Sequence, residues 1–464
     1  MYHTLTSNFR YPDYLRLRKE FPVFTYQSYT ITRNPDEITI VFHFHLSGRY
    51  HFYPAIQFPM RSFYHSDLPE PLLHNLAFHI GMVELISYWK LSCAPVVEII
   101  PFDLSEAQKQ WWKKLYFHGL GEFFYVNGIQ SSIDDFMDIH TKGSSLPVKQ
   151  HQAITDHCLV PVGGGKDSAV SLELLKQYGF PFRPLIVNPR PASTACAQIA
   201  GYSPEESILV VRSLDPLMLQ LNDQGFLNGH TPFSALLAFI SAFAAILTHA
   251  SFIVLSNESS ANEASVPNTD INHQYSKSVI FEKDFRLYLN TYIVSGIEYF
   301  SLLRPLNELQ IAHLFSKYSS FHPVFKSCNI GSKTNSWCGN CSKCLFTWLM
   351  LSPFLSQPEL HQIFGQNLAD NTQLTPVLAS LKGDTPNKPF ECVGTIEEVN
   401  TAIQMIVLQG IPGDLFVEFR NTQYDQTKVK QQFQTLLTRF DTDHCLPQQF
   451  EWLIRKALND RKNF

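Results

Sequence analysis

The sequence predicts an α/β protein with a parallel sheet in its middle part, an α+β region before the sheet and a mostly helical region after it. From about residue 155, short apolar strands alternate with helical segments, which is the pattern of βαβ units. The first 150 residues combine a strand pair with apolar-periodic helices, and the last hundred are mostly helical in pattern. A chain of 464 residues exceeds one ordinary domain. We therefore place domains at 1–150, 151–350 and 351–464.

The N-terminal region opens with two predicted strands, at 38–44 and 50–52, around a turn at Ser47-Gly48. Helices follow at 72–89 and 106–117. His43, His45 and His51 share one strand face, and we interpret them as solvent-facing or sheet-packing residues rather than metal ligands. The glycines of 119–123 indicate a turn with a specific backbone geometry. We expect this region to recognise the substrate.

The middle region carries the α/β pattern. Strands are predicted at 158–162, 184–188, 207–212, 252–256 and 300–304, and helices at 168–178, 192–200, 233–249, 276–289 and 308–317. The apolar run 233–255 is long enough to span a membrane, but Thr248, His249 and Ser251 interrupt it. It is therefore expected to be a buried helix that leads into a buried strand.

The net charge and the N-terminal segment indicate which kinds of partner and location to expect. The net charge is −5, and no basic run exists that would follow the phosphates of a nucleic acid. The N-terminal segment 1–21 is polar and lacks the apolar core of a secretory signal. We expect a cytoplasmic protein that binds neither nucleic acid nor membrane, and the oligomeric state stays open.

The segment 158–175, CLVPVGGGKDSAVSLELL, is the most informative in the chain. Its glycines let the backbone approach a ligand closely, and the free amides of the following helix start favour an anion. Lys166 adds a positive charge, and Ser168 can hydrogen-bond a phosphate oxygen. The Walker pattern requires Ser or Thr where Asp167 stands, and the spaced glycine of the dinucleotide fingerprint is missing.

This loop resembles the S-G-G-x-D-S loop of PP-loop enzymes, the ATP pyrophosphatases of the adenine nucleotide alpha hydrolase-like class. That resemblance implies an enzyme that splits ATP into AMP and pyrophosphate while adenylylating a carboxylate or carbonyl oxygen. Gly163 departs from the pattern because it replaces the first serine, so one hydroxyl that would bind phosphate is lost. The expected ATP-binding residues of the loop are Gly163, Gly164, Gly165, Lys166, Asp167 and Ser168.

Four of the nine cysteines lie in one short segment, at Cys328, Cys338, Cys341 and Cys344. Thiolates at this spacing suit tetrahedral zinc, and four protein ligands leave no open position for catalysis. We therefore expect a structural Zn²⁺ site, with reduced, metal-free cysteines as the alternative. The scattered cysteines are interpreted as packing residues: Cys93, Cys158, Cys196, Cys392 and Cys445.

A PP-loop followed by such cysteines resembles the 7-cyano-7-deazaguanine synthases, but those are much shorter and lack a comparable N-terminal region. A resemblance over most of the chain is to the bacterial UDP-N-acetyl-muramoyl-L-alanyl-L-glutamate epimerase family. The phrases that carry it are GLGEF at 119–123, SNESSAN at 256–262, NHQYSKS at 272–278, RPL at 304–306 and WCGNC at 337–341.

The resemblance implies inversion of the terminal L-Glu of UDP-MurNAc-L-Ala-L-Glu to D-Glu, for peptidoglycan, with ATP and Mg²⁺. A free carboxylate makes its α-proton very weakly acidic. An acyl-adenylate removes that charge, so that a base can take the proton before the other face is reprotonated. Hydrolysis then releases AMP.

Provisional roles follow for polar residues near the expected sheet edge. Ser256 and Asn257 would position ATP, with Asn257 and Glu258 also candidates for Mg²⁺, and Arg304 would grip a phosphate or a carboxylate. The acid–base candidates are Glu258, Glu263, His273 and Lys277. Alternatives stay open: Glu263 and Lys277 as solvated loop charges, His273 as a loop bridge, and Arg304 in a structural salt bridge.

Other functions compete with the epimerase. An amidating or nitrile-forming ligase of the deazaguanine type would need ammonia. A thiolating tRNA-modification enzyme would favour a basic surface, which the charge balance lacks. A non-catalytic ATP sensor is the remaining class, and Gly163 keeps it open.

Overall fold

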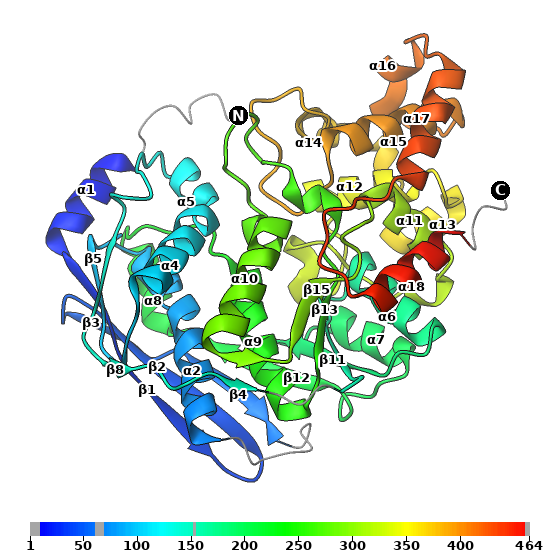
Figure 1. Cartoon of the computed structure of the whole chain (residues 1–464). Coiled ribbons are helices and arrows are strands. Elements are labelled where there is room, and N and C mark those ends of the chain that lie inside the picture. Colours follow the sequence, from blue (N-terminus) through cyan, green and yellow to red (C-terminus); the bar gives the residue numbers. More distant parts are fainter. Residues whose placement is uncertain (1–9, 61–68, 152–154, 460–464) are drawn as a thin grey trace.

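One long sheet organises the molecule (Figure 1). The computed structural model describes residues 10–60, 69–151 and 155–459, so the first nine residues of the polar N-terminal segment lie outside it. Strand β3 (Tyr50–Phe52) pairs with β2, off the main path. Along that path the order is β15 (Glu298–Ser301), β13 (Phe252–Leu255), β10 (Cys158–Pro161), β11 (Phe182–Val187), β12 (Ile208–Ser213), β4 (Ala55–Pro59), β2 (Glu37–Leu46), β1 (Val23–Arg33), β5 (Val96–Ile99) and β7 (Asp138–Thr141).

The half of the sheet from β15 to β12 is entirely parallel, as the alternating pattern predicts. Side chains of a strand alternate between the two faces. Leu159 and Ile253 accordingly pack into one hydrophobic core, while Val160 and Val254 pack into the other. Both faces are therefore buried, which explains why these strands are apolar throughout.

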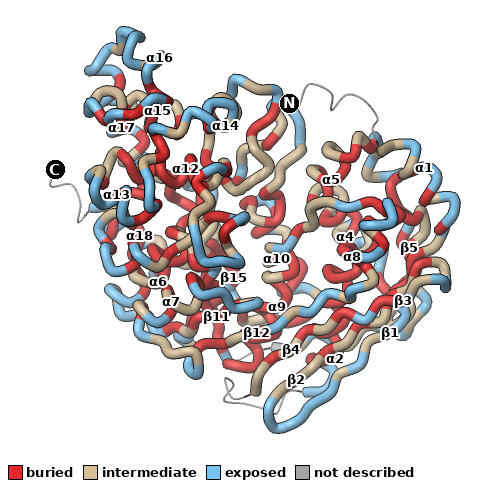
Figure 2. The backbone as a smooth tube through the Cα atoms, turned by 180° about the vertical axis from the view of Figure 1, so that it is seen from behind, coloured by how far each residue is buried: buried red, intermediate tan, exposed pale blue. Residues whose placement is uncertain are grey.

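Helices cover both faces, and the buried residues concentrate between the helices and the sheet (Figure 2). The core shared with the N-terminal region takes residues from α1 (Tyr11–Glu20), α2 (Glu70–Glu84), α3 (Ile86–Trp89), α4 (Glu106–Gly119), α5 (Gly121–Val126), α8 (Pro216–Asp223), α9 (Phe233–Thr248) and α10 (Val279–Tyr292). The opposite core takes residues from α6 (Lys166–Gln177), α7 (Pro191–Ala200), α11 (Glu308–Ser316) and α12 (Ser342–Leu351).

The C-terminal region is helical, as predicted, and extends the second core. Its helices are α13 (Gln357–Phe364), α14 (Thr375–Leu381), α15 (Ile396–Leu408), α16 (Val417–Arg420), α17 (Gln426–Thr438) and α18 (Gln448–Asn459). In Figure 1 the orange helices α15, α16 and α17 stand at the corner of the molecule away from β1 and β2.

The N-terminal strand pair is confirmed. β2 and β3 are antiparallel around Ser47 and Gly48, which have φ values of 48° and 67°. His43 and His51 lie on the expected common face, with His43 Nε2 2.9 Å from His51 Nδ1. Strands β1, β4, β5 and β7 were not expected. Because β4 pairs antiparallel with β12, the sheet crosses residue 150 without a break, and the division into domains there stays a prediction.

Two local predictions are wrong. Residues 119–123 form a junction between α4 and α5 rather than a turn; Gly119 is required because a Cβ there would lie 2.7 Å from a side-chain carbon of Pro232. The last strand of the parallel sheet ends at Ser301, three residues early. The amide of Arg304 donates to the carbonyl of Ser301 at 3.1 Å, which closes a turn.

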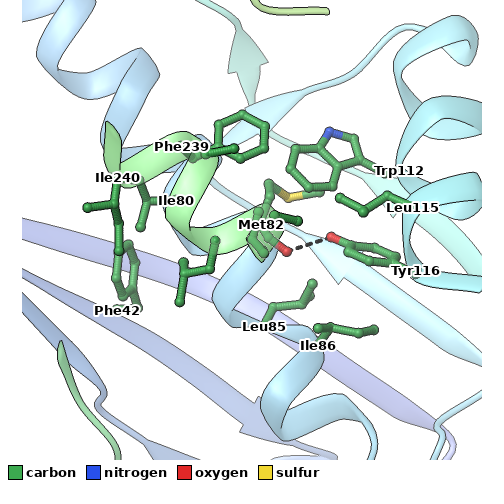
Figure 3. Packing of buried hydrophobic residues seen from close by; sticks show 14 of the residues in the cluster. Phe42, Ile80, Met82, Leu85, Ile86, Trp112, Leu115, Tyr116, Phe239 and Ile240 are labelled. Atoms are coloured by element: carbon green, nitrogen blue, oxygen red, sulfur yellow. Dashed lines mark hydrogen bonds between the residues drawn. The ribbon is translucent and has the colours of Figure 1, made fainter. Parts of the chain in front are cut away.

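The apolar run 233–255 becomes α9 and β13, as predicted. His249, with φ of 52°, ends the helix in the left-handed region. Figure 3 shows Phe239 and Ile240 of α9 beside Ile80 and Met82 of α2, where the Tyr116 hydroxyl of α4 donates to the Met82 carbonyl at 2.6 Å. Among the described residues, no helix has both the length and the apolar character needed to cross a bilayer.

Candidate active site

The glycine loop connects β10 to the start of α6, at the carboxyl edge of the parallel sheet. Gly164 has φ of 86°, and a Cβ there would lie 2.6 Å from the amide nitrogen of Ser193. A Cβ on Gly163 would meet nothing within 4 Å. The N-cap of α6 is Gly165, so no side chain caps the first-turn amides. Such a helix start favours a bound anion.

Contacts from a distant segment hold this loop in place. The amide of Lys326 donates to the carbonyl of Gly164 at 2.9 Å. The Ser168 hydroxyl donates to the Gly165 carbonyl at 3.0 Å and accepts from the Gly164 amide at 3.3 Å. Ser168 is buried, and its hydroxyl stabilises the loop through these two bonds.

Lys166 lies beneath the loop rather than in solvent. Its ammonium forms ion pairs with Asp167 and Glu308, and its side chain is only 4% exposed. Burial acts to lower its pKa, but Asp167, Glu308 and Glu258 outweigh burial and raise it. Lys166 is thus held in its charged form.

Glu308 and Glu398 extend this group of charges, and sequence reasoning missed both. The amide of Glu308 donates to the Glu398 carboxylate at 2.9 Å. Burial raises the pKa of Glu308, and the nearby carboxylates of Asp167, Glu258 and Glu398 add to that effect, while the charge of Lys166 opposes it. In the sequence, Glu308 is only the expected first residue of a helix and Glu398 has no motif around it.

The segment after β13 lies beside these carboxylates. Asn257 Nδ2 donates to Ser301 Oγ at 3.1 Å, which ties the ends of two adjacent strands together. Glu258 is buried, and its charge acts on both Lys166 and Lys277. The sheet edge expected from sequence therefore does bring the glycine loop and Glu258 together.

Arg304 is fully buried and is bonded to the protein. It forms an ion pair with Glu282 at 3.0 Å and donates to the carbonyls of Glu258 (2.6 Å) and Lys277. This arrangement fits the structural salt bridge that the sequence left as the alternative. Arg304 fixes the backbone at two other candidate residues.

Cys392 corrects the interpretation of the scattered cysteines. It lies among charged groups rather than in an apolar core, and the residue is of intermediate burial. Lys277 Nζ lies 2.9 Å from its sulfur, and His273 also acts on the pKa of the thiol. Cys392 gave no signal in the sequence because Lys277, which contacts its sulfur, is 115 positions away.

These contacts shift the pKa values of the residues that make them. Burial acts to raise the pKa of Cys392, but the charge of Lys277 and the hydrogen bond from His273 lower it to about 6. Burial acts to lower the pKa of His273, yet its bonds to Cys392 and Glu122 raise it to about 9. At neutral pH the geometry therefore favours a thiolate beside a protonated imidazole.

Glu122 and His230 complete this second group. Glu122 Oε2 bonds His273 Nδ1 and lies 3.6 Å from His230 Nδ1, so one carboxylate oxygen serves both rings. Burial, with His273 and Lys90, lowers the pKa of His230 to about 3. A cavity of about 470 Å³ is lined by Phe117, Gly121, Tyr125, Gln130, Asp270 and Ile271 among others, which include sequence neighbours of Glu122 on α5.

Glu263 stands apart from these groups. It forms an ion pair with Lys388, and its side chain is 32% exposed. The structure thus brings Glu258, His273 and Lys277 toward one region and leaves Glu263 in a separate ion pair.

The four clustered cysteines converge as their spacing predicts. Sulfur–sulfur distances are 3.8 Å for Cys328–Cys341, 3.7 Å for Cys338–Cys344 and 3.5 Å for Cys341–Cys344. A tetrahedral ion with metal–sulfur bonds of about 2.3 Å places its ligands roughly 3.8 Å apart, so the spacing suits zinc. Gly339 has φ of 71°, and a Cβ there would lie 1.8 Å from Gln366 Nε2.

This cysteine cluster supports both groups described above. Cys328 follows Lys326, whose amide holds the glycine loop. On its other side, the amide of Lys343 donates to the Glu391 carboxylate at 3.0 Å, and the Lys343 ammonium bonds the Cys392 carbonyl. One short segment therefore contacts both the glycine loop and the backbone at Cys392.

Comparisons with known proteins identify relatives over most of the chain. The family model of the MurL N-terminal domain matches residues 16–302, and that of the MurL C-terminal domain matches residues 324–434. A protein of Xanthomonas oryzae pv. oryzae is 35% identical over 342 residues, which cover 70% of this chain and 73% of the relative.

Two further relatives come from Micromonospora sp. and Salinispora tropica. The Micromonospora protein is 34% identical, and the match covers 84% of this chain and 88% of that relative. The Salinispora tropica protein is 32% identical, and the match covers 84% of this chain and 85% of that relative. All three relatives are named UDP-N-acetyl-alpha-D-muramoyl-L-alanyl-L-glutamate epimerase. No solved structure matches the chain at a significant level.

Proposed function

The chain belongs to the MurL family, and from that premise we propose that it is an ATP-dependent epimerase acting on UDP-MurNAc-L-Ala-L-Glu. The terminal L-Glu would become D-Glu for peptidoglycan precursor synthesis. The observation that carries the proposal is one continuous set of charges. It runs from the glycine loop through Lys277 to Cys392 and His273.

ATP would bind with its phosphates at the start of α6. The uncapped amides after Gly165 and the close backbone approach at Gly164 support this placement. The substrate carboxylate attacks the α-phosphorus of ATP, an acyl-adenylate forms, and pyrophosphate leaves. Resemblance of the loop to PP-loop enzymes supports this route.

Mg²⁺ would be held by carboxylate oxygens, which are the ligands that this ion prefers. Asp167 and Glu258 fit, because both act on the charges of Lys166 and Lys277 and lie beside the loop. The ion would neutralise the phosphates during adenylation. Lys166 remains beneath them and balances the carboxylates of Asp167 and Glu308.

Inversion would follow at the adenylated residue. Converting the carboxylate into an acyl-adenylate removes the negative charge that suppresses ionisation of the α-carbon. A base can then remove the α-proton, and delivery of a proton to the opposite face gives the D centre. Water hydrolyses the adenylate, so that each inversion consumes one ATP and releases AMP.

The substrate's nucleotide-sugar portion needs space outside this chemistry. The cavity of about 470 Å³ is lined largely by residues of the N-terminal region. Its aromatic side chains Phe117 and Tyr125, together with Gln130 and Asp270, combine apolar and polar surface as ligand sites do. We assign part of the UDP-muramoyl portion to it.

The four clustered cysteines would hold a structural Zn²⁺. Their sulfur spacing supports this, and so do backbone amides that donate to sulfur, with Gly331 N to Cys328 at 3.2 Å and Asn340 N to Cys338 at 3.5 Å. The ion would fix the segment that positions the glycine loop and Cys392, and it would take no part in catalysis.

Pyrophosphate release tests the adenylation directly. The purified protein is incubated with ATP and Mg²⁺, with and without UDP-MurNAc-L-Ala-L-Glu. We expect release that depends on the dipeptide-linked nucleotide and needs no ammonia. Release that requires ammonia and another acceptor would favour a ligase, and ATP binding without any turnover would favour a sensor.

A further inference from the structure

We propose that Cys392, as a thiolate, removes the α-proton of the glutamyl residue during inversion; this rests on the epimerase function proposed above. Among the described residues, Cys392 is the sulfur that lies between the glycine-loop charges and the Glu122–His273 pair. No sequence motif surrounds it.

Three cationic groups from three separate elements approach Cys392. Lys277 ends the short helix η3 (Tyr275–Lys277), and its ammonium lies 2.9 Å from the sulfur. His273 comes from the loop before η3, and Lys343 from the first turn of α12. A thiolate is the nucleophilic and basic form of cysteine, and adjacent lysine and histidine cations stabilise it.

Other cysteines of the chain provide the contrast. Cys93, Cys158 and Cys196 are buried in apolar surroundings, which raises their pKa values. Cys445 is partly exposed like Cys392, but burial raises its pKa to about 11. Partial exposure alone therefore does not favour a thiolate, and the feature that sets Cys392 apart is the ammonium of Lys277 in contact with its sulfur.

The position of Cys392 matches the chemistry that adenylation prepares. Lys277 interacts with Cys392 on one side and with the charges of Glu258 and Asp167 on the other. A carboxyl group activated at the glycine loop would therefore have its α-carbon near Lys277. A base for that carbon has to come from this region, and Cys392 is the thiol that contacts Lys277 there.

The proton transfer balances within the proposed reaction. The Cα–H bond of the acyl-adenylate breaks, an S–H bond forms, and the C–H electron pair moves into the acyl carbonyl as an enolate. Lys277 faces the new negative charge and stabilises it. A proton from water adds to the other face, and the thiol proton returns to solvent, which restores the thiolate.

Two substitutions separate this role from adenylation. Cys392→Ala and Cys392→Ser are assayed in D₂O with ATP, Mg²⁺ and UDP-MurNAc-L-Ala-L-Glu. Wild-type enzyme should place deuterium on the α-carbon of D-Glu. In both variants the rates of D-Glu formation and of deuterium incorporation at the α-carbon should fall by about 10²–10⁴-fold, the usual contribution of a proton-transfer group. Pyrophosphate release should continue, because the adenylate still forms and hydrolyses.

Cys445→Ala is the matched control, because Cys445 is also partly exposed and has cations nearby, Lys283, Arg286 and Arg304, yet burial outweighs them and its pKa is raised. It should keep both activities. Cys392 variants with wild-type D-Glu formation would overturn the inference and leave the epimerase intact. Loss of pyrophosphate release together with inversion would also overturn it, since Cys392 would then serve adenylation. A wild-type enzyme without substrate-dependent pyrophosphate release would contradict the proposed function itself.

Discussion

The ammonium nitrogen of Lys277 lies 2.9 Å from the sulfur of Cys392, although 115 positions separate the two residues. The same ammonium interacts with the charges of Glu258 and Asp167. Lys277 thus joins the glycine loop to the thiol. The proposed inversion requires this connection, because an activated carboxyl group and the base for its α-proton must meet in one place.

Replacing Lys277 with Met should raise the pKa of Cys392. The variant would lose the positive charge that most lowers the pKa of Cys392, while burial would still oppose the thiolate. In the wild type the thiolate is lost as the pH falls through about 6. In Lys277→Met that midpoint should move upward. Iodoacetamide alkylation of Cys392, followed by mass spectrometry between pH 5 and 9, measures it. An unchanged midpoint would show that Lys277 does not stabilise the thiolate.

Two adjacent glycines should respond in opposite ways. Gly164→Ala should abolish pyrophosphate release and lower the unfolding free energy by about 1–3 kcal/mol, because φ is 86° and the Cβ would lie 2.6 Å from the Ser193 amide. Gly163→Ser should change the unfolding free energy by no more than about 0.5 kcal/mol, because a Cβ there meets nothing within 4 Å.

Gly163→Ser would also restore the serine of the PP-loop pattern. We expect it to retain pyrophosphate release at the wild-type level or above, measured at several ATP concentrations. Equal losses in the two variants would contradict the distinction between a packed and an open glycine.

Much of the parallel sheet could be predicted from the sequence, because strands buried on both faces are apolar throughout and alternate with helices. Strand β1 was missed because it is long, and its outer residues from Gln27 to Arg33 are mostly exposed or half-exposed. Its place is set by pairing with β2 and β5, which local patterns do not report.

Asp167→Ala should abolish substrate-dependent pyrophosphate release. Asp167 pairs with Lys166 and stands at the start of α6, where the phosphates are expected. Asp223→Ala, at the exposed end of α8, is the control and should retain full activity. Wild-type turnover in Asp167→Ala would contradict the assignment of this carboxylate to ATP and Mg²⁺.

Lys166→Met should lower the free energy of unfolding by about 3 kcal/mol. Removing one partner of a buried ion pair leaves an uncompensated charge, and the side chains of Lys166 and Glu308 are 4% and 3% exposed. The double variant Lys166→Met with Glu308→Gln should recover part of that loss. Additive losses in urea unfolding would show that the pair is not coupled.

The candidate site was only partly accessible to sequence reasoning. The glycine loop and the cysteine cluster are local motifs, and their residues come together as expected. Glu308, Glu398 and Cys392 reach the site through tertiary packing, and nothing in their immediate neighbours marks them. Arg304 shows the reverse: it belongs to a phrase that the family resemblance rests on, but its two terminal nitrogens are bonded to Glu282 and to two backbone carbonyls.

Cys341→Ser should release the proposed zinc and lower the thermal midpoint by about 5 °C or more, because metal binding stabilises the fold that forms the site. Zinc content by mass spectrometry and thermal unfolding measure the two effects. Cys445→Ser, outside the cluster, should change neither. A wild-type protein purified without metal, yet stable to chelators, would contradict a structural zinc site.

The most direct test follows the stereochemistry of the glutamate. The protein is incubated with ATP, Mg²⁺ and UDP-MurNAc-L-Ala-L-Glu, the product is hydrolysed, and the glutamate is analysed on a chiral column alongside AMP. The account predicts D-Glu together with AMP in at least equal amount. Glutamate that remains L while ATP is unused would contradict the epimerase function on this substrate.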